Sequence, residues 1–375
     1  MSAELGADSD YSKGEMWIMT FEKLIAGIQP IDEKKRQAAM ERCDQLVKPL
    51  GSLGKLESIA CRLAGIYGEI CPEIKGKAVI VMAADNGVLE EGVASAPKEI
   101  TAMQTLNMVK GVTGVMVLAK QNGAQVRIVD IGVDAELQGE GLIQEKIRRG
   151  TGNIAKEPAM SREEAMAAIM VGVRQVEALK DEGVNLFGTG EMGIGNTTTS
   201  SAIVHACFPE LPIASITGKG AGLTEEAFLH KQDVIRRAVE VNQVDGADPL
   251  DILAKVGGLD IAGMVGTYLG AAYYGLPVVI DGVISAAAAL LASRFAPNAR
   301  EYMFASHCSM EPAYQAIMER IGLEPTLYLD MRLGEGSGCP IMFSVMEFAC
   351  AMQKNMETFA ETAMQDDFLV DIRES

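Results

Sequence analysis

Basic residues are scarce in this chain relative to acidic ones. Its 375 residues include 33 lysines and arginines against 51 aspartates and glutamates, a formal net charge of −18. Nucleic acid is therefore not an expected partner, because a phosphate backbone requires a basic surface. A small anionic substrate is still possible where backbone N–H groups or lysines are arranged locally to meet it.

Patterns that would indicate a metal site, a disulfide framework or a secretion signal are also missing from the sequence. The three histidines, His205, His230 and His307, show no paired spacing, and the seven cysteines form no C-x-x-C pair. We therefore expect no metal or cofactor, and free thiols in a reducing compartment. The first residues, MSAELGADSDYSKGE, are polar and acidic, which favours a cytoplasmic location over secretion.

One stretch, 261–280, contains no charged residue, and Gly275-Leu-Pro277 interrupts it. The break leaves about 14 helical residues, fewer than the ~20 that a membrane span needs. Glycine and alanine are frequent within it, which suits a helix packed closely inside a domain. We expect a buried helix and no membrane contact.

Short apolar runs alternate with helical patterns along most of the chain. Expected strands lie at 78–84, 126–131, 184–187, 212–215, 277–280, 302–305 and 326–329, and expected helices include 98–122, 161–180, 224–242 and 283–293. Nearly continuous apolar strands between helices are typical of a parallel sheet covered on both faces. The sequence predicts an α/β protein with a flexible tail (1–16), a small helical domain (17–70 plus 341–365) and a large α/β catalytic domain (71–340).

Polar residues collect where the expected strands end. Asp85 and Asn86 follow the first, Asp281 follows 277–280, and Ser306 and His307 follow 302–305. Ligands bind beyond the carboxyl ends of the strands of an open parallel sheet. Each such residue can also simply end a strand or cap a helix, but their number favours a binding site at this edge.

The segment 188–201, GTGEMGIGNTTTSS, predicts a phosphate site. Its first glycines fit a dinucleotide fingerprint, but no Gly-Lys-Ser/Thr follows, and the acidic residue expected about twenty positions on would be Glu210, within a Pro-flanked turn. The run from Asn196 opens a helix whose N-terminus attracts a phosphate monoester. Glu191 would repel an adjacent phosphate, so we expect it to face a neutral or cationic part of the ligand, or a hydroxyl. The alternative is a glycine-rich turn packed against a helix.

A second candidate site surrounds Glu335, which lies between glycines in LGEGSG (333–338). A carboxylate among mostly apolar neighbours is a suitable general base near neutral pH; an exposed turn glutamate is the alternative. Loop 85–101, the glycine and lysine segment 217–222 with Lys231, and the glycine pair in 256–258 are further ligand-binding candidates.

These motifs occur together in a known family. The chain resembles the nicotinate-nucleotide–dimethylbenzimidazole phosphoribosyltransferases, which activate the lower ligand of cobalamin. The resemblance runs from about residue 48 to 359 and is carried by KPLGSLGKLE (48–57), GEMGIGNTT (190–198), VGG (256–258), PVVIDG (277–282), SH (306–307) and RLGEG (332–336). It implies a Rossmann-like large domain, a small domain built from both chain ends, and a homodimer, with a heterodimer as the alternative.

The implied reaction transfers phosphoribose from nicotinate mononucleotide to 5,6-dimethylbenzimidazole or a related aromatic base, giving α-ribazole 5′-phosphate and nicotinate. Glu335 corresponds to the family's general base and Glu191 to its second active-site carboxylate. The implied substrate-binding residues are Asp85, Asn86, Ser95, Met103, Gln104, Gly190, Gly193, Gly195, Asn196, Thr197, Lys231, Gly257, Gly258, Asp281, Ser306, Gly334 and Gly336.

Two positions depart from the family pattern. Members usually have a histidine where this chain has Asn86, and a glutamine where Met103 precedes Gln104. Both positions belong to the part expected to contact the acceptor. The identity of the acceptor therefore stays open between a benzimidazole, a purine and a phenol. The sequence also leaves open a non-catalytic paralogue, a magnesium phosphohydrolase using Asp85, Asp281 and Asp330, and a nicotinamide-dependent oxidoreductase.

Overall fold

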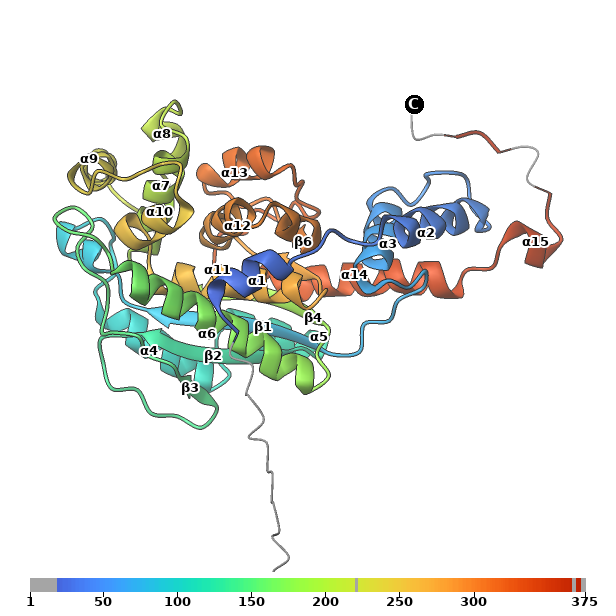
Figure 1. The fold of residues 1–375 in the computed structure, drawn as a ribbon, viewed down its shortest axis with the longest axis horizontal. Helices are drawn as coiled ribbons and strands as arrows, with labels where there is room; N and C mark the ends of the chain where they lie inside the picture. The colour runs from blue at the N-terminus through green and yellow to red at the C-terminus, as the bar shows by residue number, and fades with distance from the viewer. Residues whose placement is uncertain (1–18, 220–221, 366–368, 372–375) are drawn as a thin grey trace, which may run out of the picture.

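The computed structural model describes residues 19–219, 222–365 and 369–371, and the expected tail at 1–16 lies outside them. Six strands form one parallel sheet in the order β3-β2-β1-β4-β5-β6 (Figure 1). The strands are β1 (Lys77–Ala84), β2 (Gln125–Gly132), β3 (Leu142–Gln144), β4 (Leu186–Met192), β5 (Val278–Ile280) and β6 (Met303–Ala305). The strand order reverses between β1 and β4, the arrangement of a doubly wound fold, which binds ligands at that point. The predicted α/β class is confirmed.

Helices cover both faces of the sheet. Contacts with the strands place α11 (Leu259–Tyr273) and α12 (Val283–Phe295) on one face, and α4 (Glu99–Val109), α5 (Gly114–Asn122) and the start of α14 (Gly338–Asn355) on the other. The remaining helices of this part are α6 (Arg162–Asp181), α7 (Asn196–Cys207), α8 (Ile213–Ile216), α9 (Glu225–Val241), α10 (Pro249–Val256) and α13 (Ala313–Ile321).

The uncharged stretch 261–280 forms the buried helix α11 and strand β5, as predicted. Glycines let α11 lie against α6, since a Cβ on Gly172 would lie 2.0 Å from the Gly263 carbonyl oxygen and one on Gly266 would lie 1.8 Å from that of Ile169. Among the described helices, none combines the length and apolar character that a membrane crossing requires.

Four expected elements differ from the structure, and one strand was not expected. The segment 212–215 belongs to the short helix α8, and 326–329 contributes only an isolated bridge between Leu327 and His307. The expected helix 98–122 is divided into α4 and α5, and β3 was not predicted. The expected strand 184–187 begins two residues later, as β4, and continues through the glycines to Met192.

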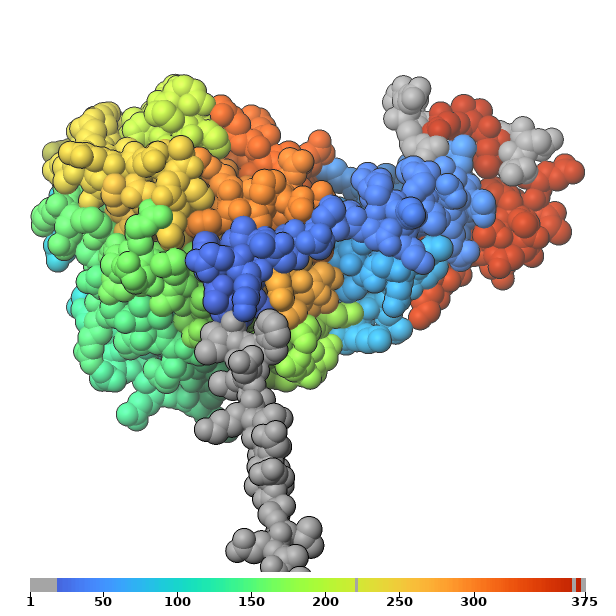
Figure 2. Space-filling model, viewed as in Figure 1, coloured from blue at the N-terminus to red at the C-terminus, as the bar shows by residue number. Residues whose placement is uncertain are grey.

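Both chain ends contribute to a helical layer beside the sheet (Figure 1), which forms the blue and red lobe of the space-filling view (Figure 2). Helices α2 (Glu33–Gln45) and α3 (Lys55–Tyr67) pack with α14, and Arg42 Nε donates to the Gln353 carbonyl while Gln353 Nε2 donates to that of Ala39. The expected domain boundary at 340/341 falls inside α14, which runs from the sheet to these helices (Figure 1). Helix α1 (Phe21–Gly27) packs instead on α11, and α15 (Phe359–Thr362) follows α14.

Candidate active site

A cleft of about 320 Å³ opens where β4 and β5 end. Its walls come from the end of β4 and the start of α7, the turn from β5 into α12, and segments 307–311 and 332–335. Loop 93–96, one side of α4 and two lysines complete it. The cleft therefore lies beyond the carboxyl ends of the strands, where an open parallel sheet binds its ligands.

The glycine run that suggested a nucleotide loop is mostly a strand. Gly188 and Gly190 lie within β4, where a Cβ on Gly188 would lie 2.6 Å from Cys339 Cβ and one on Gly190 would lie 2.3 Å from the Glu335 carbonyl oxygen. Gly188 thus makes room for the Cys339 side chain at the start of α14 and Gly190 for the backbone at Glu335, so neither surrounds a phosphate. The turn that opens α7 comes later, at Gly195, whose φ is 98°.

Glu335 lies at the cleft and is 6% exposed, which excludes the exposed-turn alternative. Its Oε1 accepts a hydrogen bond from Gln104 Nε2 at 2.8 Å, and its Oε2 accepts one from the Val115 backbone N–H at 3.1 Å. The carboxylate is thereby fixed between α4 and the first turn of α5.

Glu191 lies beside the Glu335 segment and is 8% exposed. Its Oε1 accepts the Glu335 N–H at 3.2 Å, and its Oε2 accepts the side-chain amide of Asn196. The same amide donates to Asp260 Oδ2 at 3.0 Å. Burial raises the pKa of Glu191 to about 7 and that of Asp260 to about 6, so Glu191 changes charge near neutral pH.

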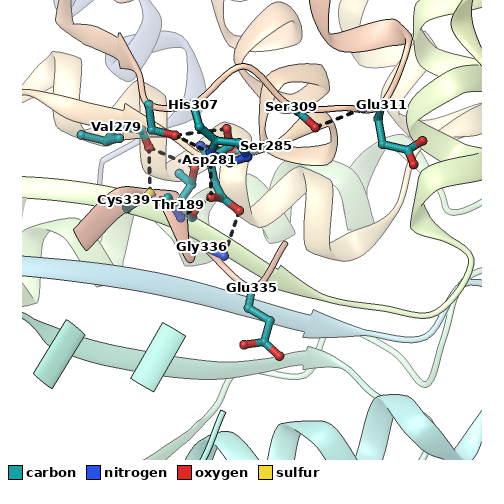
Figure 3. Close-up of polar contacts among 12 residues, drawn as sticks. Thr189, Val279, Asp281, Ser285, His307, Ser309, Glu311, Glu335, Gly336 and Cys339 are labelled. Carbon is teal, nitrogen blue, oxygen red and sulfur yellow. Dashed lines mark hydrogen bonds and ion pairs between the residues drawn. The ribbon is translucent and has the colours of Figure 1, made fainter. Parts of the chain in front are cut away.

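Asp281 follows β5 directly and is 2% exposed. Its Oδ2 accepts the Gly336 N–H at 3.0 Å and its Oδ1 accepts the Gly338 N–H at 2.7 Å, as Figure 3 shows for Gly336. Burial raises the pKa of Asp281 to about 7 and lowers that of the neighbouring His307.

Cationic side chains occupy another part of the cleft. Lys231 is buried, and its Nζ donates to Thr197 Oγ1 and to the Gly218 carbonyl oxygen, both at 3.0 Å. Burial lowers its pKa to about 8. Lys219 and Arg332 also line the cleft. The cleft thus contains both buried carboxylates and a lysine close to the start of α7.

The structure brings eleven of the sequence-predicted site residues to the cleft wall: Ser95, Gln104, Glu191, Gly193, Gly195, Asn196, Thr197, Lys231, Asp281, Gly334 and Glu335. The others lie nearby or behind it. Asp85 and Asn86 line a neighbouring pocket, and Met103 is 58% exposed and does not line the cleft.

Of the remaining predicted residues, Gly190 and Gly336 pack against each other, since a Cβ on Gly336 would lie 3.0 Å from the Gly190 Cα. Gly258 lies against Asp260 and Asn86, and Gly257 against Leu253. Ser306 is buried and donates to the Asp281 carbonyl oxygen at 3.3 Å. All of these residues pack behind the cleft wall and support it.

Lys219 and His307, which the sequence had placed in candidate segments, line the cleft. The sequence interpretation missed four further cleft or supporting side chains: Asp260, Ser309, Glu311 and Arg332. Asp260 directly follows the glycine pair 257–258 and starts α11, which was a usable signal. The others lie within or beside the motifs described above, but their orientation depends on the packing of separate elements.

Comparisons with known proteins agree with this architecture. Residues 28–364 match the sequence model of a phosphoribosyltransferase family, so the chain is an enzyme of the glycosyltransferase type that transfers phosphoribosyl groups. It is 49% identical over 347 residues to the nicotinate-nucleotide–dimethylbenzimidazole phosphoribosyltransferase of Ruminiclostridium cellulolyticum, with 92% of this chain and 98% of the relative covered. It is 48% identical over 347 residues to that of Clostridium acetobutylicum, with the same coverage.

A solved structure shows the same fold. The crystal structure of CobT from Thermus thermophilus has a TM-score of 0.85 and 38% identity, with 89% of this chain and 99% of that chain covered. The chain belongs to the nicotinate-nucleotide–dimethylbenzimidazole phosphoribosyltransferase family.

Proposed function

We propose that this enzyme transfers phosphoribose from nicotinate mononucleotide to 5,6-dimethylbenzimidazole or a closely related base, giving α-ribazole 5′-phosphate and nicotinate. The names of its relatives supply the substrates. The observation that supports the reaction in this chain is the buried Glu335 carboxylate, fixed by Gln104 and the Val115 N–H at the cleft wall.

Glu335 acts as the general base in this proposal. One nitrogen of the azole attacks C1′ of the ribose, the bond from C1′ to the pyridinium nitrogen breaks, and the N–H proton of the azole passes to Glu335. The leaving group takes the bonding electron pair and loses its positive charge, so its departure requires no general acid. A positioned base contributes ~10²–10⁴ in rate.

The donor's phosphate is proposed to bind where α7 begins. Helix N-termini attract phosphate groups through their unpaired N–H groups, and Lys231 contacts Thr197 in the first turn of α7. Glu191 then faces the ribose and pyridinium side, where it stabilises the positive charge that develops on the ribose.

The acceptor is proposed to lie against a mostly apolar wall that includes Ala94, Ile100 and Leu333. Gln104 retains only one acceptor lone pair for an exocyclic amine, because its Nε2 donates to Glu335 and its Oε1 already accepts from Asn107 Nδ2 at 3.2 Å. This supports an azole with an apolar ring over a purine. The Met103 side chain is exposed and does not line the cleft. Its departure from the family's usual glutamine is therefore no argument for a phenolic acceptor.

The cytoplasmic location, the homodimer and the division into a small helical and a large catalytic domain are also proposed, on the resemblance to the family. Sedimentation of the purified protein tests the homodimer.

The catalytic proposal is tested by Glu335→Gln with nicotinate mononucleotide and a panel of 5,6-dimethylbenzimidazole, adenine and phenol, the products being identified by mass. We expect kcat to fall by ~10²–10⁴, with nucleotide binding within a few-fold of wild type. Glu319→Gln, on the surface of α13, is the matched control. Turnover near the wild-type level would exclude Glu335 as the base, and the absence of a ribotide with every acceptor would reject the function.

A further inference from the structure

The backbone around Glu335 has an unusual conformation. Gly334, Glu335 and Gly336 have φ values of 84°, 63° and 92°, so three successive residues lie in the left-handed region. For a residue with a side chain this conformation is strained. Such a segment keeps its shape only if its surroundings hold it.

Buried carboxylates hold this segment through its backbone N–H groups. Glu191 Oε1 accepts from Glu335, whereas the two oxygens of Asp281 accept separately from Gly336 and Gly338. Hydrogen bonds from N–H groups to a carboxylate are among the strong ones. Asp281 therefore binds the chain just beyond Glu335 at two points.

Asp281 is itself rigidly placed. Its backbone N–H donates to Ser285 Oγ at 3.0 Å, and that hydroxyl belongs to a buried cluster with Tyr268 and Thr189. The Gly338 backbone packs tightly between Asp281 and His307, since a Cβ on Gly338 would lie 2.3 Å from His307 Nδ1 and 2.9 Å from Asp281 Oδ1. Figure 3 shows Ser285, His307 and Gly336 close to Asp281.

We propose that Asp281 is a positioning residue, which fixes the Glu335 carboxylate by binding the Gly336 and Gly338 N–H groups instead of contacting the phosphoribosyl donor. The inference rests on the proposed role of Glu335 as the base. The rival role, a direct contact with the ribose, arises because Asp281 also lines the cleft.

A double-mutant cycle separates the two roles. Asp281→Asn removes the charge and one acceptor; we expect kcat to fall ~10–100-fold, because a misplacement of about 1 Å costs up to ~10². The KM for nicotinate mononucleotide should change less than ~3-fold. In the Glu335→Gln background, Asp281→Asn should change kcat by less than ~3-fold, because residues acting as a unit are not additive.

A conservative variant and a buried control complete the experiment. Asp281→Glu keeps the charge but moves the carboxylate by one methylene, and should lose kcat in the same way. Asp130→Asn replaces another buried aspartate at a strand end, one that accepts the Val133 N–H at 2.9 Å. It should lower the melting temperature without lowering the kcat of the folded enzyme.

The outcomes are distinct. A raised KM with unchanged kcat in Asp281→Asn, or losses that multiply with those of Glu335→Gln, would assign Asp281 to substrate binding and overturn the positioning role alone. Unchanged turnover in Glu335→Gln would overturn the base assignment and the positioning role together.

Discussion

Gly190 offers a direct test of how closely β4 and the Glu335 segment fit. A Cβ at this position would lie 2.3 Å from the Glu335 carbonyl oxygen and 2.9 Å from its carbonyl carbon. Carbon atoms prefer to lie about 3.5–4.0 Å from their neighbours, so Gly190→Ala requires a displacement of about 1 Å. The obstructing atom is backbone, which cannot rotate away as the end of a side chain would.

The displacement should damage turnover more than folding. The Glu335 N–H would move away from Glu191, and the carboxylate would leave the position set by Gln104. We expect kcat to fall ~10²-fold and the free energy of unfolding to fall by about 1–3 kcal/mol, as for other overpacked sites. Single-turnover rates, with products quantified by mass, and denaturant unfolding measure the two effects.

Gly123→Ala is the control for Gly190→Ala. Gly123 ends α5 with a φ of 70°, and a Cβ there would meet nothing within 4 Å. Backbone strain should destabilise this variant by about 1–2 kcal/mol while its kcat stays unchanged. A wild-type kcat in Gly190→Ala would refute the reasoning that contact at β4 positions the Glu335 segment.

Two further predictions concern pH. Burial raises the pKa of Glu191 from 4.5 to about 7, so its contribution to stability is present below pH ~4.5 and is lost as the pH rises through ~7. Between pH 5 and pH 8, Glu191→Gln should therefore gain up to ~3 kcal/mol relative to wild type in the free energy of unfolding, and a constant difference would contradict this. Lys231, with its pKa lowered to about 8, loses its charge as the pH rises through that value. The kcat/KM for nicotinate mononucleotide should fall above pH ~8 and Lys231→Met should abolish that transition; a transition that persists would exclude Lys231 as its source.

The sheet was predictable where strands are buried on both faces. Strands β1, β2, β5 and β6 lie within about two residues of the expected runs, because continuous apolar segments between helices leave few other structures. Strand β3 has three residues and pairs only with β2, which is too short for a periodic signal. The run 212–215 belongs mostly to the four-residue helix α8, whose last residue, Ile216, is buried, and so short a run does not distinguish helix from strand.

The candidate site was predictable in composition but not in assembly. The sequence indicated Glu191 and Glu335 separately, since each lies among glycines. Nothing in the local pattern showed that Gly188 and Gly190 accommodate the Glu335 segment and the start of α14, more than 140 residues further along. Gly190 allows a close approach between two backbones and Gly188 allows the Cys339 side chain to pack against β4, and only the tertiary structure shows these contacts.

The same buried carboxylates explain why stability and activity should oppose each other at this site. Glu191 and Asp281 lie in surroundings that raise the pKa of each to about 7, so their ionised forms are costly to bury at neutral pH. Their oxygens nevertheless accept the N–H groups of the strained segment that carries Glu335. A neutral replacement relieves the burial of charge but weakens the hold on that segment. Above neutral pH, Glu191→Gln should therefore be a more stable protein and a slower enzyme than wild type.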